Sequence, residues 1–220
     1  MIDILLDILA MAIPVIFAIT LHEAAHGYVA NVLGDPTARM LGRISINPMK
    51  HVDPMGTLAV PFALFVFSRI THAPLTLIGW AKPVPIDVRR LRNQRSSMAW
   101  VAAAGPASNF LMLLLWAIVL RWVSVTEVSP FSLYAEQMAE AGVQINAVLM
   151  VFNLLPIPPL DGGRILVSTL PIAWAIQLES LERYSMIIIL VLAFSGNLLE
   201  SLMRPLLYAT LSLADWIVGL

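Results

Sequence analysis

The chain has 220 residues, of which 59% are hydrophobic and only 12% are charged, and its formal net charge at pH 7 is -1. An ordinary soluble domain carries about 25% charged residues, so this composition excludes that class and predicts an integral membrane protein in a lipid bilayer. The absence of a dense basic surface excludes a nucleic-acid partner, and the absence of cysteine excludes disulfides and thiolate metal sites.

Apolar runs long enough to cross a bilayer recur along the chain. A spanning helix needs about 20 mostly apolar residues, and five segments approach or exceed that length. We therefore expect an all-α polytopic membrane protein with about five to six transmembrane helices. The predicted spans cover residues 4–33, 98–120, 143–160, 184–199 and 203–219, and prolines interrupt the third.

The distribution of Lys and Arg in the short loops predicts the orientation. Loops 34–53 and 82–95 are basic, which places them in the cytoplasm. Loop 123–142 has no Lys or Arg but has three Glu, so we expect this loop and the N-terminus to lie outside. Both flanks of the apolar stretch 57–80 are then cytoplasmic, and this stretch is predicted to enter and leave the membrane as a re-entrant hairpin.

Two segments differ from the helical pattern. LGRISIN at 41–47 alternates apolar and polar residues as a strand does. PLTLIGWAKPVPI at 74–86 is bounded by prolines and rich in residues that favour strands. We expect a small β-sheet at the cytoplasmic face of the membrane, with an irregular loop as the alternative.

The first predicted span contains three ionisable residues in the sequence LHEAAHGYVA, at 21–30. His22 and His26 are four residues apart, so both imidazoles lie on one face of a helix and can reach one ion. Glu23 lies beside them and could take a proton from water. This is the H-E-x-x-H pattern of zinc peptidases. The alternative is a pair of hydrogen-bonded helix histidines with a chance Glu, which the cost of ionisable groups in a bilayer disfavours.

A catalytic zinc site needs a third protein ligand and one open position. Asp161 follows the third span in NLLPIPPLDGGRIL, at 153–166. The prolines break the helix there, and Gly162 and Gly163 permit unusual backbone angles. Irregular backbone at membrane depth must be buried in protein or line a watery cavity, where a carboxylate could bind a metal. Asp161 could instead cap the helix that follows, and the two roles are compatible.

The predicted topology brings these residues to one side of the membrane. The first and third spans both run from outside to inside. His22 lies past the midpoint of the first span, and Asp161 lies near the end of the third. Both therefore belong to the cytoplasmic half of the bilayer.

Taken together, these motifs resemble the site-2 protease family of intramembrane zinc metalloproteases. Loop 123–142 is far too short for the PDZ domain that many family members carry, so the chain resembles a minimal form of a single intramembrane metalloprotease domain, 1–220, with its catalytic core at about 1–170 and two additional C-terminal helices at 184–219. The matching motifs are LHEAAHGYVA at 21–30, GWAKPVP at 79–85, AAAGPASNF at 102–110 and NLLPIPPLDGG at 153–163.

The resemblance implies one zinc ion per chain, held by His22, His26 and Asp161, with Glu23 as the catalytic base. It also implies that Asn153 lies near the substrate backbone, although hydrogen bonding within a breaking helix would equally explain this amide. Gly105, Pro106 and Asn109 resemble packing features of the family, since small residues let helices approach closely.

The substrate implied by the resemblance is a transmembrane protein or peptide, cleaved in or near its transmembrane segment, for regulated proteolysis or for clearance of membrane remnants. A prokaryotic cytoplasmic membrane is the expected location. The strand-like segments would offer an edge to an unwound substrate. The sequence does not indicate the oligomeric state.

Three alternatives stay open. His51 could be an exposed loop residue, a hydrogen-bonding group at the entrance to the site, or a ligand that blocks the metal at rest. A zinc carrier would also need intramembrane His and Asp, but it would not need Glu23. An inactive family member would bind segments without cutting them, which the intact motifs argue against.

Overall fold

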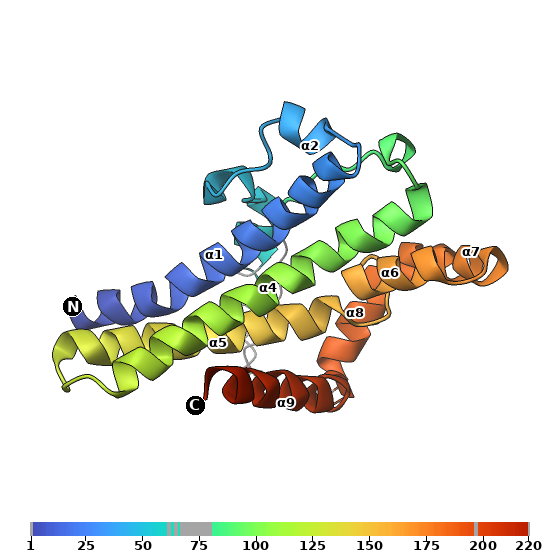
Figure 1. The fold of residues 1–220 in the computed structure, drawn as a ribbon. Coiled ribbons are helices and arrows are strands. Elements are labelled where there is room, and N and C mark those ends of the chain that lie inside the picture. The colour runs from blue at the N-terminus through green and yellow to red at the C-terminus, as the bar shows by residue number, and fades with distance from the viewer. Residues whose placement is uncertain (1, 61–62, 64–65, 67–80, 196–197, 220) are drawn as a thin grey trace.

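The computed structural model describes residues 2–60, 63, 66, 81–195 and 198–219, and the described residues are helical or irregular, without a strand (Figure 1). The longer helices are α1 (Ile2–Val32), α4 (Gln94–Ser124), α5 (Pro130–Asn153), α6 (Asp161–Thr169), α7 (Ile172–Ser180), α8 (Ser185–Phe194) and α9 (Leu198–Val218). The short helical segments between α1 and α4 are α2 (Thr37–Met40), Pro48–Lys50, the π-helical Pro54–Ala59 and Val88–Arg90.

A bundle of α1, α4 and α5 forms the centre of the molecule. The three helices lie side by side, with α4 running opposite to the other two (Figure 1). Small buried residues such as Ala18, Gly105 and Ala147 lie in these helices, and small side chains let helix backbones approach closely. Because α1 and α5 run in the same direction, the end of α1 and the chain after α5 lie at the same end of the bundle.

Two of the described helices are long and apolar enough to cross a membrane. They are Leu9–Val32 within α1 and Gln94–Ser124, which is α4. Both were predicted as spans. The other described helices are shorter or less apolar, so the structure supports two candidate spans rather than the expected five to six. In particular, α8 has ten residues and is about 15 Å long, half the thickness of the hydrocarbon core.

The prediction that residues 123–142 form an outer loop is wrong over most of this range. Helix α5 begins at Pro130, and only a short connection separates it from α4. Ser129 and Ser132 form a reciprocal capping box at this start, and proline suits the first helical position. The helix tolerates the polar residues of the segment because Ala139 is buried while Glu140 is exposed.

The predicted strand at 41–47 is also absent. Gly42 adopts a positive φ of 63°, and the N–H of Arg43 donates back to the carbonyl of Ala38, which makes a turn after α2. The side chain of Asn47 then accepts from the N–H of Met49 and starts the next helical turn. Alternating polarity in this segment therefore reflects turns at the end of the bundle and not a pleated surface.

The second predicted strand, at 74–86, is described only from residue 81, and residues 81–86 form neither strand nor helix. Pro83 and Pro85 have no N–H to donate to a ladder. The N–H of Lys82 donates to the carbonyl of His51, and the N–H of Val84 donates to a side chain. The predicted re-entrant hairpin at 57–80 lies largely outside the described residues.

Beyond the bundle, the chain turns back along it. Residues 154–160 connect α5 to α6 without regular structure, and α6 packs against α4. The expected pair of C-terminal helices is observed as α8 and α9. Helix α9 packs against α4 and α5 (Figure 1), where Ala214 joins Leu113 and Ala147 in one apolar cluster.

Candidate metal centre

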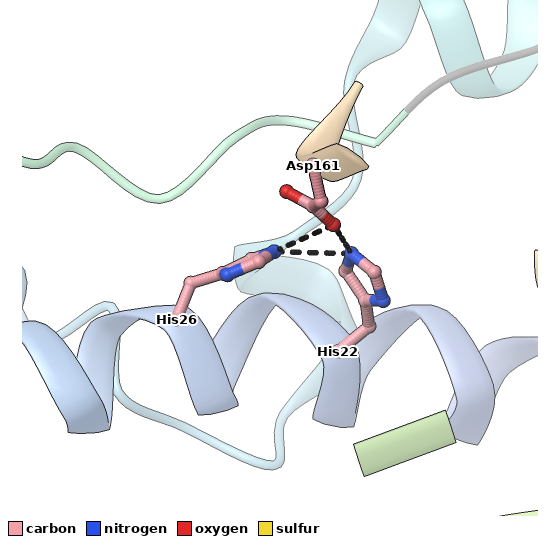
Figure 2. A group of neighbouring side chains, drawn as sticks. All are labelled: His22, His26 and Asp161. Carbon is pink, nitrogen blue, oxygen red and sulfur yellow. Dashed lines mark hydrogen bonds and ion pairs between the residues drawn. The ribbon is translucent and has the colours of Figure 1, made fainter. Parts of the chain in front are cut away.

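Three ligand atoms from two distant parts of the chain converge in one buried spot (Figure 2). The Nε2 atoms of His22 and His26 are 3.1 Å apart, and the carboxylate Oδ2 of Asp161 lies 3.1 Å from the first and 3.4 Å from the second. All three residues are buried, with exposed fractions of 6–8%. Helix α1 supplies the imidazoles one turn apart, and the first residue of α6 supplies the carboxylate.

The other nitrogen of each imidazole is fixed by α4. Nδ1 of His22 lies 2.5 Å from the side-chain oxygen of Asn109, and Nδ1 of His26 lies 2.7 Å from the backbone carbonyl of Val101. Both partners are acceptors, so each Nδ1 donates a proton. In a neutral imidazole, Nε2 is then left with a free lone pair.

This tautomer explains why the three converging atoms need a cation. Two lone pairs and a carboxylate oxygen face one another, and Oδ2 of Asp161 has no hydrogen-bond donor among the described residues although it is buried. Donor atoms that share a tetrahedral zinc at about 2.0–2.1 Å lie roughly 3.3–3.4 Å apart, close to the observed 3.1–3.4 Å. The residues therefore fit a zinc ion, and imidazoles tied through Nδ1 are typical of metal ligands.

Gly105 explains how α4 can lie against the two imidazoles. A Cβ atom built on this residue would come within 2.4 Å of Nε2 of His26 and 2.5 Å of Nε2 of His22. Any other residue would therefore push a side chain onto the ligand atoms. The sequence suggested a packing role for Gly105, and the structure gives the reason: the helix must leave space for the site itself.

Asn109 was also interpreted as a packing residue, but it contacts a site residue directly. Its Nδ2 group donates to the side-chain oxygen of Asn146 at 3.0 Å and approaches the carbonyl of Ala18 at 3.3 Å, which directs Oδ1 to His22. Nδ2 of Asn146 donates to the carbonyl of Gly142. Both amides are fully buried. Buried polar groups in an apolar span need partners, and this rule could have identified both residues from the sequence.

Asp161 is the first residue of α6 and does not cap it. Leu160 occupies the cap position, where no side-chain hydrogen bond forms, so the capping alternative is wrong. The predicted reason for the glycines is also wrong, because Gly162 and Gly163 are helical and have no positive φ. Their Cβ atoms would instead lie 2.2–2.3 Å from the carbonyl of Leu154 and the nitrogen of Pro158, so α6 can fold closely onto the preceding loop.

Glu23 is half-buried and is held by the irregular segment 81–86. Its Oε2 accepts the backbone N–H of Val84 at 2.8 Å. Because Pro83 and Pro85 have no N–H, Val84 supplies the one donor of this tripeptide. The Val84 side chain packs where Gly27 leaves room, 3.0 Å from the position of a Cβ on that glycine.

His51 and Asn153 do not join the three converging atoms. His51 is buried, its Nε2 lies 2.9 Å from the carbonyl of Ser45, and its own carbonyl accepts from Lys82. It therefore connects the segments around the site, and it is not the exposed loop residue that was one alternative. Nδ2 of Asn153 donates to the carbonyl of Leu149 one turn earlier in α5, as expected for hydrogen bonding within a breaking helix.

Comparison with known proteins agrees with this geometry. Residues 129–196 match the sequence model of peptidase family M50. A Bacillus subtilis protein provisionally named zinc metalloprotease YwhC is 35% identical over 185 residues, which cover 83% of this chain and 78% of that protein.

More distant relatives come from mycobacteria. A Mycobacterium tuberculosis H37Rv protein provisionally named zinc metalloprotease Rip2 is 29% identical over 183 residues, which cover 82% of this chain and 65% of that protein. The Mycolicibacterium smegmatis Rip2 protein is 29% identical over 149 residues, 67% of this chain and 52% of that protein. No solved structure gives a significant match. The identity to YwhC, together with the buried His, His and Asp, shows that this chain belongs to peptidase family M50, the membrane-bound zinc metalloproteases of the site-2 protease type.

Proposed function

We propose that this protein is an intramembrane zinc metalloprotease that hydrolyses peptide bonds in or near the transmembrane segments of partner membrane proteins. His22, His26 and Asp161 hold the zinc ion in this proposal, and Glu23 is the catalytic base. Regulated proteolysis of a membrane protein and clearance of membrane remnants both fit this activity.

One observation carries the proposal. The lone pairs of two imidazoles and a carboxylate oxygen converge within 3.4 Å inside an apolar bundle, in an arrangement that is unfavourable without a cation. Ionisable groups within a membrane span are expensive and are functional as a rule. Glu23, next to the first imidazole, adds a proton acceptor that a site built only to bind metal does not require.

The chemistry divides between the ion and the chain. When bound, zinc activates water at neutral pH and polarises a carbonyl group. In this proposal the Glu23 carboxylate takes a proton from the attacking water and passes it to the leaving amine. The N–H of Val84 binds Oε2 of Glu23, which leaves Oε1 for this proton. We extend the proposal to Asn153, at the end of α5, whose amide would bind the backbone of the substrate.

We further propose that the centre lies in the cytoplasmic half of a bacterial inner membrane, with the N-terminus outside. His22 and His26 lie in the second half of α1. The basic segments that follow α1 and precede α4 lie at that same end of the bundle (Figure 1), and basic loops are typical of the cytoplasmic side. The relatives come from bacteria, which supports a bacterial source.

The test combines metal content with cleavage. Purified wild type in detergent is expected to hold about one zinc per chain by elemental mass spectrometry, and Asp161→Ala should lose most of it. Glu23→Gln should keep the zinc but cut no transmembrane peptide in proteoliposomes. Asp215→Ala, which removes a carboxylate in α9 outside the centre, is the matched control and should keep both properties.

The outcomes separate the alternatives. Zinc that survives Asp161→Ala would contradict the three-ligand site. A zinc carrier would keep its function in Glu23→Gln. Wild type that binds zinc but cuts none of a broad set of transmembrane peptides would contradict the protease.

A further inference from the structure

A cavity of about 600 Å³ lies next to the candidate metal centre, between the segment that holds Glu23 and the helices α6 and α7. Two of its lining residues connect it to the centre. Val84 donates its N–H to Glu23, and Arg164 lies one turn after Asp161 on α6. Residues three apart on a helix lie on the same face, so Arg164 continues the face that carries the carboxylate.

Arg164 contributes a positive charge to the lining of this cavity. It is partly buried, and its guanidinium has no hydrogen bond or ion pair with any residue in the described ranges. The other lining cation, Arg95, already donates to the carbonyls of Val167 and Leu170 at the end of α6. A guanidinium has five N–H donors and pairs most strongly with a carboxylate or phosphate. Arg164 is therefore available for an external anion.

The remaining lining includes both apolar and acidic residues. Met98, Val167, Ile172 and Ile176 provide aliphatic surface, while Glu179 and Glu182 add two exposed carboxylates at the end of α7 and just after it. Both the headgroup of a phospholipid and an acidic side chain could pair with Arg164. Two carboxylates in the same cavity repel a phosphate, but they favour a peptide that carries an acidic residue followed by basic ones.

We propose that this cavity is a substrate subsite, in which Arg164 pairs with an acidic side chain close to the scissile bond on the cytoplasmic flank of the substrate. The inference rests on the proposed function. The flanks of transmembrane segments on the cytoplasmic side are rich in Lys and Arg, so Glu179 and Glu182 suit the basic residues that follow. An extended substrate that runs from Glu23 past Val84 would enter the cavity directly, because Val84 both binds Glu23 and lines the cavity.

The test measures binding, so it does not depend on turnover. Zinc-loaded Glu23→Gln in neutral detergent micelles would be titrated with labelled transmembrane peptides. The peptides are identical except for one flank position that is Glu, Gln or Lys, moved stepwise along the flank. At one position the Glu peptide is expected to bind about tenfold more tightly than the Gln peptide, a typical strength for a charge-assisted pair.

Variants of Arg164 then test whether this residue causes the preference for the Glu peptide. Added to Glu23→Gln, Arg164→Gln should abolish it, Arg164→Lys should keep part of it, and Arg164→Glu should favour the Lys peptide. The matched control is Arg89→Gln, because Arg89 belongs to the basic loop 82–95, does not line the cavity and is paired: its hydrogen bond to Asp87 holds the pKa of that carboxyl below its usual value. This control should keep the full preference, and zinc content checks that each variant is folded.

Two results would overturn the subsite. One is equal binding of the Glu and Gln peptides at every flank position. The other is a preference that anionic phospholipid added to the micelles removes, which would mean that a headgroup occupies the cavity. Cleavage by wild type measured in parallel separates the two proposals: peptides that are discriminated but never cut contradict the protease, whereas peptides that are cut without flank preference contradict the subsite.

Discussion

The imidazoles and Glu23 are neighbours on α1, yet they are held by different parts of the molecule. His22 and His26 are held by groups of α4, inside the packed bundle. Glu23 is held by one backbone N–H in a segment without helix or strand. That segment is itself fixed by Arg43, whose guanidinium donates to the carbonyls of residues 82 and 83, and by the carbonyl of His51.

In the proposed mechanism, this difference implies that metal binding and proton transfer by Glu23 can be separated by mutation. The contacts that orient the metal-binding atoms depend on how closely two long helices pack. The contact that orients Glu23 depends on an irregular chain at the end of the bundle. Changes in the bundle should therefore remove zinc, whereas changes in the segment 81–86 should leave zinc in place and slow the reaction.

The largest effect is expected for Gly105→Ala. The added methyl group would lie within about 2.5 Å of both Nε2 atoms, so either α4 moves away or the imidazoles turn. Zinc measured by elemental mass spectrometry should fall close to background, and activity should fall with it. Ala107→Val, at an exposed position of the same helix, adds more volume but should leave zinc content unchanged. Full zinc occupancy in Gly105→Ala would refute the close approach.

An intermediate effect is expected for Asn109→Leu. The substitution removes the acceptor of His22 Nδ1 and leaves Asn146 without its buried partner. Loss of such a partner typically lowers metal affinity 10–100-fold, which competition with a chromophoric chelator would measure. Asn109→Asp keeps an acceptor oxygen and should lose less. If the two variants bound zinc equally well, the hydrogen bond to His22 would not matter.

The smallest effect is expected for Val84→Pro, which removes the N–H that binds Glu23. Because Glu23 is half-buried, this hydrogen bond should contribute about 1.5 kcal/mol, the low end for a bond to a charged group, so kcat should fall about tenfold while zinc content stays constant. Val84→Ala keeps the N–H and loses only packing against Gly27, so its kcat should stay closer to wild type. Zinc loss in Val84→Pro would show that this segment also supports the metal site.

The sequence predicts well what depends on local spacing and on apolar length. Spans 4–33 and 98–120 coincide with the two candidate membrane helices. The four-residue spacing of His22 and His26 does place their Nε2 atoms together, and the break after α5 brings Asp161 to them. These features need only the helical period and the length of an apolar run.

The sequence predicts less well what depends on contacts between distant residues. Asn109 is 87 residues from His22, and Val84 is 61 residues from Glu23, so no local pattern pairs them. The strand prediction at 81–86 failed because two prolines prevent a ladder and the remaining N–H groups bind elsewhere. The start of α5 was not predicted because the Glu residues before residue 143 are typical of a loop. Ser129 and Pro130 nevertheless already give the signal for a helix start.

The separation of Asp161 from the two histidines also sets the order in which the site assembles during biosynthesis. The ribosome makes α1 first and then α4, which supplies the partners of both Nδ1 atoms. The carboxylate follows 135 residues after His26. A nascent chain that stops short of α6 therefore has two oriented imidazoles but an incomplete ligand set. Proteolytic competence would then arise only after the bundle has formed, which protects the membrane from unfinished copies of the enzyme.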